Sequence, residues 1–138
     1  MSRERVMVVS EQPSFREEVA RLIEDHGLQS FAAADAIDAL RQIYHVRPRV
    51  IVSDAGLSRL SGFELLPFVR RRFPAVGVIA VGATEAGRDE DRPVADMLVP
   101  KDPWNPEYFI DQLRRMLAQW PLRAEQEPDC AYPCAIRD

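Results

Sequence analysis

Five short runs of apolar residues recur along the chain and constrain its fold more than any other feature. The clearest cover residues 6–9, 50–53, 76–81 and 97–99, and a weaker, mixed run covers residues 28–33. Runs of this length suit strands of a parallel sheet, which are apolar throughout because helices cover both faces of the sheet. The mixed run predicts a strand at the sheet edge.

Residue patterns typical of helices lie between the first three runs. Pro13 opens a first helix, and Gly27 is a favourable residue for ending it. Asp35 can cap the start of a second helix, which Pro48 ends. The chain therefore alternates strand and helix from its first residues.

The same alternation of strand and helix continues to residue 120, and only the fourth helix is weakly predicted. A third helix is predicted from Phe63 onward, and Pro106 opens a last helix that we expect to end at Pro121. The stretch of residues 84–93, TEAGRDEDRP, has no apolar stripe and predicts a reduced fourth helix. We expect residues 121–138 to form an extended or mobile tail.

Alternating strands and helices predict an α/β fold in which a parallel sheet has helices on both faces and right-handed crossovers. At this size the common solution is a doubly wound, flavodoxin-like sheet of five strands in the order 2-1-3-4-5. The prediction is one domain over residues 1–120, followed by the tail of residues 121–138.

Composition excludes several classes of protein. A net charge of −4 over 138 residues does not favour binding to nucleic acid or to a membrane surface. No apolar run approaches the roughly 20 residues that span a bilayer, and the N-terminus lacks the pattern of a signal peptide. Cys130 and Cys134 do not make a disulfide framework. A cytoplasmic protein is the simplest expectation.

The predicted topology brings polar residues together where the strand order reverses, between the first and third strands. Ser10, Glu11 and Asp54 fall there, with Gly82 and Lys101 beside them. Two carboxylates facing each other repel unless a cation lies between them, and oxygen ligands of this kind suit magnesium. A lysine nearby can pair with an anion, so this edge has the groups needed to place a phosphoryl group on an aspartate.

From Arg5 to Trp120 the chain resembles the receiver domain of bacterial two-component response regulators. The matching features are an apolar strand ending in polar residues, a strand-end Asp54 with Gly62 eight residues later, and Ala95-Asp96 ahead of Lys101. The resemblance implies that Asp54 accepts a phosphoryl group and that Lys101 binds its phosphate. It also implies that Glu11, Asp54 and the backbone of Gly56 hold Mg²⁺.

The departures from the family pattern concern how phosphorylation is sensed. Ser10 replaces the first of two acids and adds no charge, although its hydroxyl could hold a metal-bound water. Gly82 stands where the family has a hydroxyl residue, and Leu98 (or Met97) where it has an aromatic switch residue. We therefore expect weakened magnesium binding and a weakened or absent switch.

These observations lead to three hypotheses for the function, and the residues that carry them also have simpler structural interpretations. The leading hypothesis is a stand-alone receiver that takes a phosphoryl group from a histidine kinase or phosphotransfer protein and acts on an unknown downstream protein. The second is a phosphorylation-independent interaction module, or pseudo-receiver, with a homodimer possible. A small enzyme is the weakest hypothesis, and we expect that the protein is not an enzyme. In the plainer alternatives Asp54 caps a loop, and Glu11 and Lys101 are solvated.

Overall fold

The computed structural model describes residues 3–54, 68–69, 71–82 and 95–126, and the side chains of these residues as far as Gln119. Its strands are β1 (Arg5–Val9), β2 (Gln29–Ala33), β3 (Val50–Asp54), β4 (Gly77–Val81) and β5 (Met97–Val99). All pair in parallel, in the order β2-β1-β3-β4-β5. The predicted doubly wound α/β fold is confirmed, and the mixed run is an edge strand.

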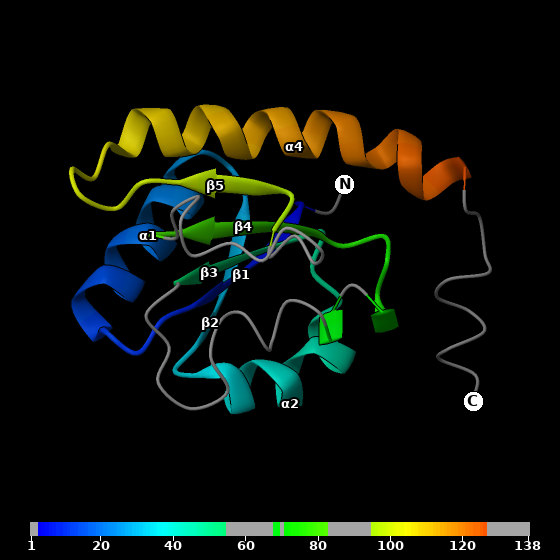
Figure 1. Cartoon of the computed structure of the whole chain (residues 1–138), viewed down its shortest axis with the longest axis horizontal. Coiled ribbons are helices and arrows are strands. Elements are labelled where there is room, and N and C mark those ends of the chain that lie inside the picture. Colours follow the sequence, from blue (N-terminus) through cyan, green and yellow to red (C-terminus); the bar gives the residue numbers. More distant parts are fainter. Residues whose placement is uncertain (1–2, 55–67, 70, 83–94, 127–138) are drawn as a thin grey trace.

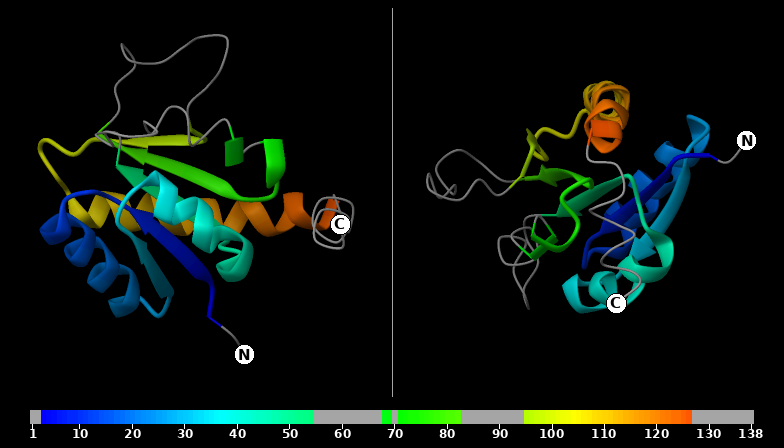
Figure 2. Two further views of the ribbon diagram at one scale, coloured as in Figure 1. Left: turned by 90° about the horizontal axis from the view of Figure 1, so that it is seen from below. Right: turned by 90° about the vertical axis from the view of Figure 1, so that its right-hand side faces the viewer.

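Helices cover both faces of this sheet (Figures 1 and 2). On one face lie α1 (Pro13–Asp25) and α4 (Pro106–Gln126), and on the other lies α2 (Ala36–Val46). Consecutive residues of a strand point to opposite faces, so Val6 and Val8 pack under α1 and α4 while Met7 and Val9 pack under α2. Two apolar cores result, which explains why the strands are apolar at nearly every position.

The predicted helix boundaries at the amino half of the chain rest on identifiable local contacts. Pro13 occupies the first turn of α1, and Gly27 follows the helix with a φ of +83°. The side chain of Asp35 accepts a hydrogen bond of 2.8 Å from the backbone N–H of Asp38, which caps α2 as predicted. Arg47 then ends α2 in the left-handed conformation, ahead of Pro48.

The predicted end of the last helix at Pro121 is wrong, because α4 continues through Pro121 to Gln126. Proline removes one backbone N–H and strains the preceding turn, at a cost of about 3 kcal/mol, but it does not forbid a helix. The end of α4 extends past the strands in both Figures 1 and 2. The proposed boundary between a domain of residues 1–120 and a tail remains a prediction.

Other predictions fall wholly or partly outside the described residues. The predicted third helix is helical at residues 68–69 and 71–72, and its earlier part is not described. The reduced fourth helix of residues 84–93 and the tail beyond Gln126 also lie outside. In the part of the chain that is described, no helix has the length and apolar character to cross a membrane.

Candidate functional site

The pairing of β1 with β3 places Ser10 and Asp54 side by side at the carboxyl edge of the sheet. The register pairs Val9 with Ser53, so the next residue of each strand lies at the same edge. Lys101 reaches this edge from the segment after β5, two residues beyond Val99. Residues far apart in the sequence thus meet at the point where the strand order reverses, between β1 and β3.

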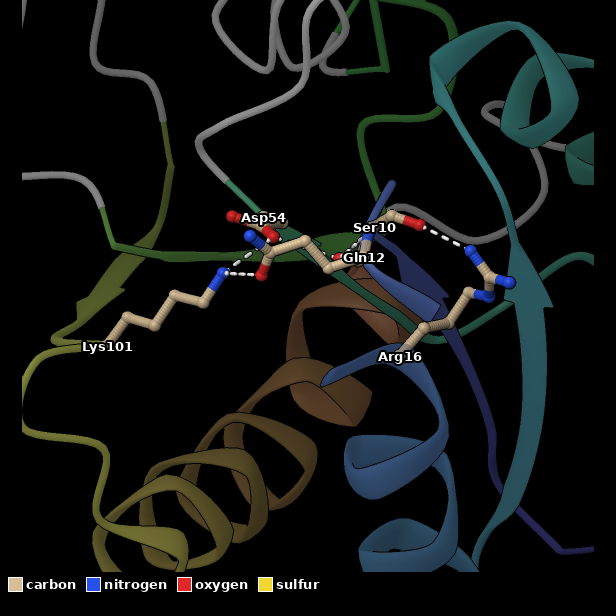
Figure 3. Close-up of polar contacts among 5 residues, drawn as sticks. All are labelled: Ser10, Gln12, Arg16, Asp54 and Lys101. Carbon is tan, nitrogen blue, oxygen red and sulfur yellow. Dashed lines mark hydrogen bonds and ion pairs between the residues drawn. The ribbon is translucent and has the colours of Figure 1, made fainter. Parts of the chain in front are cut away.

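Asp54 is a buried carboxylate held by donors from the segments that follow β1 and β5 (Figure 3). Its Oδ2 accepts a hydrogen bond of 2.9 Å from the hydroxyl of Ser10 and lies 3.0 Å from the Nζ of Lys101. The side chain of Asp54 is 8% exposed and that of Lys101 is 27% exposed. A buried carboxylate needs such partners, because burying an uncompensated charge is costly. This pairing makes a loop-capping role for Asp54 and a solvated Lys101 the weaker interpretations.

Ser10 is fixed from several sides and cannot rotate its hydroxyl freely. Its oxygen accepts from the backbone N–H of Gln12 at 3.1 Å, so its single O–H is directed to Asp54. The side chain of Arg16 donates to the backbone carbonyl of Ser10 at 2.8 Å. Our expectation that this hydroxyl could hold a metal-bound water remains a prediction beside its hydrogen bond to Asp54.

The residues around Asp54 provide few charges for a metal ion. Glu11 follows Ser10 and is half-buried, while Gly56 lies outside the described residues. Among the described residues, no three His, Cys, Asp or Glu side chains gather into a group suited to a metal. Mg²⁺ needs only one or two carboxylates and keeps several waters. The carboxylates of Glu11 and Asp54 fit that minimum, and they would bind the ion less strongly than three acids.

Gly82 and Leu98, which we predicted to be degenerate switch positions, have surroundings that suit a glycine and an aliphatic side chain. Gly82 has a φ of +92°, and its N–H donates to the carbonyl of Val99 at 2.8 Å. A residue with a side chain rarely adopts this conformation, so the backbone at this position favours glycine. Leu98 is partly buried and packs against the core under α2.

Sequence reasoning missed Gln12, which contacts the site directly. Its Oε1 accepts a hydrogen bond of 2.7 Å from the Nζ of Lys101 (Figure 3). Gln12 stands immediately before Pro13 and follows the polar end of β1, so its place at the carboxyl edge was readable. Its role was not, because the contact spans 89 residues of sequence.

Comparisons with known proteins identify the family of the chain. The sequence model of the response regulator receiver domain matches residues 6–95. The nitrogen assimilation regulatory protein NtrX of Azorhizobium caulinodans is 37% identical over 78 residues, covering 55% of this chain and 17% of NtrX. An uncharacterized 14.6 kDa protein of Leptolyngbya boryana is 31% identical over 90 residues, covering 65% of this chain and 69% of that protein.

Solved structures give the same result for the fold. The crystal structure of a CheY-like receiver domain protein from Methanospirillum hungatei superimposes with a TM-score of 0.80 at 22% identity, covering 88% of this chain and 99% of that one. The fold is that of CheY-like receiver domains. The chain belongs to the response regulator receiver domain family, whose members act in two-component signalling.

Proposed function

We propose that this chain is a receiver that accepts a phosphoryl group on Asp54 from a histidine kinase or a phosphotransfer protein. The observation that carries this proposal is the contact of 3.0 Å between Asp54 and Lys101 at the carboxyl edge of the sheet. Lys101 is also the single lysine of the chain, where the other 17 basic residues are arginine. A compact ammonium can pair with a phosphoryl oxygen as a point charge.

In the proposed transfer, a carboxylate oxygen of Asp54 forms a bond to phosphorus while the phosphorus–nitrogen bond of the donor breaks. The bonding electrons leave with the donor's imidazole nitrogen, and an acyl phosphate remains on Asp54. Ser10 holds the carboxylate in place through its hydroxyl, and Lys101 moves its pairing from Oδ2 to a phosphoryl oxygen. Mg²⁺ held by Glu11 and Asp54 would supply neutralisation of the phosphoryl oxygens.

The same proposal extends to where the protein acts, how it passes on its signal and how strongly its switch responds. We infer a receiver of the cytoplasm that passes its signal to a protein partner, rather than an enzyme that turns over a small molecule. The left-handed Gly82 and the aliphatic Leu98 support a weakened form of the family's usual switch. The chain spans less than a fifth of NtrX, so these statements rest on its own residues.

Exposure to a small phosphodonor such as acetyl phosphate, with magnesium, tests the assignment by intact-protein mass. We expect the wild type to gain one phosphoryl group and Asp54→Asn to gain none. Asp35→Asn is the matched control, because asparagine also caps a helix and Asp35 lies in a different loop. An undiminished gain in Asp54→Asn would show that another residue is the acceptor.

The second candidate is a pseudo-receiver that acts without phosphorylation. It is favoured by Gly82, which lacks a hydroxyl to bind a phosphoryl oxygen, and by Ser10, which adds no charge for a metal ion. Magnesium titration separates the candidates through Trp104, which packs at 5.0 Å on Phe15 beside Lys101.

In a Trp120→Phe background, a saturable fluorescence change that Asp54→Asn abolishes would support the phosphorylated receiver. No response together with no gain in mass would support the pseudo-receiver.

A further inference from the structure

The ammonium of Lys101 is held by the start of α1 as well as by Asp54. Its Nζ donates to Oε1 of Gln12 at 2.7 Å, a shorter distance than the 3.0 Å to Asp54. It also lies 4.3 Å from the ring centroid of Phe15, within range of a cation–π contact. Gln12 and Phe15 thus contact the ammonium independently of the charge on Asp54.

Gln12 can make this contact because its side chain does not cap α1. It is the N-cap residue of α1, yet its side chain makes no capping hydrogen bond. The residue types that cap well have short side chains, and the longer glutamine reaches outward instead. Because an ammonium only donates hydrogen bonds, the group that faces Lys101 must be the amide oxygen.

The backbone on both sides of the contact is fixed. Gln12 donates its N–H to the hydroxyl of Ser10, and its carbonyl accepts from the N–H of Arg16 at 2.9 Å. Lys101 forms an isolated antiparallel bridge with Trp104, whose indole N–H donates to Glu18 of α1 at 3.0 Å. The hydrogen bond between the two side chains therefore joins two anchored segments.

We propose that Gln12 is a positioning residue for Lys101, and this rests on the proposed phosphorylation of Asp54. A lysine side chain is flexible, and fixing it in advance removes an ordering step from the transfer. When Asp54 becomes an acyl phosphate, its pairing with Lys101 is lost. Gln12 then keeps the ammonium at the edge of the sheet, where it meets a phosphoryl oxygen.

The single lysine makes the position of this side chain measurable by itself. Protein grown with ¹⁵N-labelled lysine gives one side-chain ammonium signal, and the exchange of its protons with water reports how firmly Nζ is held. We expect Gln12→Ala to speed this exchange about two- to tenfold, the loss that one hydrogen bond predicts. Gln12→Glu keeps an accepting oxygen and should retain slow exchange, and Gln119→Ala on α4 is the control.

Phosphorylation kinetics provide the second measurement. Gln12→Ala should lower the rate constant with acetyl phosphate about two- to tenfold while leaving the apparent magnesium affinity and the unfolding midpoint unchanged. A merely structural role would lower the midpoint as well. Ammonium exchange and rate constants equal to those of the wild type in Gln12→Ala would overturn the proposal. If the wild type gains no phosphoryl group, the proposed function fails, and the exchange measurement still decides whether Gln12 holds Lys101.

Discussion

The pair of Lys101 and Asp54 leads to a prediction about stability that is independent of phosphorylation. Nζ and Oδ2 are 3.0 Å apart, with side-chain exposures of 27% and 8%. Two unit charges at that distance attract by about 1.4 kcal/mol in bulk water and by about 5.5 kcal/mol at an effective dielectric constant of about 20. Desolvation of Asp54 offsets part of the attraction, so we expect a net coupling of about 1–2 kcal/mol.

A double-mutant cycle isolates this coupling. Lys101→Met should lower the free energy of unfolding by about 2 kcal/mol, because it leaves a buried carboxylate without its cation. Asp54→Asn removes the charge and should cost less. In the double variant the loss from Lys101→Met should be smaller by the coupling energy, because no charge is left unpaired. Urea unfolding at neutral pH, fitted with a common slope, gives all four values.

The matched control is the ion pair of Arg115 and Asp111, one turn apart on α4. Its two atoms are 3.2 Å apart, but its side chains are 67% and 57% exposed. An exposed helical pair couples by only about 0.3–0.5 kcal/mol. If the Lys101 and Asp54 variants are additive to within about 0.3 kcal/mol, the buried contact does not stabilise the protein, and the argument from burial fails.

Three further predictions concern the fold. Leu113→Ala should cost about 3–4 kcal/mol in the free energy of unfolding because Leu113 is a fully buried residue of α4. Equal losses for Leu113→Ala and for Leu117→Ala, at a partly buried position, would contradict this. Gly82→Thr should lower the free energy of unfolding by about 1–2 kcal/mol, because a residue with a side chain is strained at the φ of +92° that Gly82 adopts. Urea unfolding that gives the stability of the wild type would show that this position imposes no such strain. The pKa of Glu24 is lowered by hydrogen bonds from Ser30, first from its backbone N–H and then from its hydroxyl. The stabilisation from these hydrogen bonds is therefore fully present above the ordinary carboxyl pKa. It is lost as the pH falls through the lowered pKa of Glu24 in the folded protein. A carboxyl NMR titration should place the pKa of Glu24 higher in Ser30→Ala, and an unchanged value would exclude the hydroxyl.

The strand order was predictable because the apolar runs are nearly continuous and each ends at a residue that favours a turn or a helix start. Both cores draw on the same strands, so Met7 and Val8 are both fully buried although they face opposite helices. The course of α4 was not predictable from Pro121. The free-energy cost of a proline is offset by the contacts that the rest of the helix makes, and the net result cannot be predicted from one residue.

At the site, Asp54 and Lys101 could be placed from topology, whereas the contacts that hold them could not. Ser10 was noted for the charge it lacks, and its importance lies in the direction of its hydroxyl. That direction depends on the backbone N–H of Gln12, a detail of loop geometry that spacing does not encode. The roles of Glu11 and Gly56 as metal ligands remain predictions.

The continuation of α4 to Gln126 gives the molecule a long rigid arm. Its 21 residues make a rod of about 32 Å at about 1.5 Å per residue. The rod begins beside Trp104, which contacts Phe15 near Lys101, and it ends beyond the strands. A tilt of about 5° at its first turn would displace its last turn by about 3 Å over that length. A small rearrangement around Lys101 would therefore be magnified at the far end of the helix.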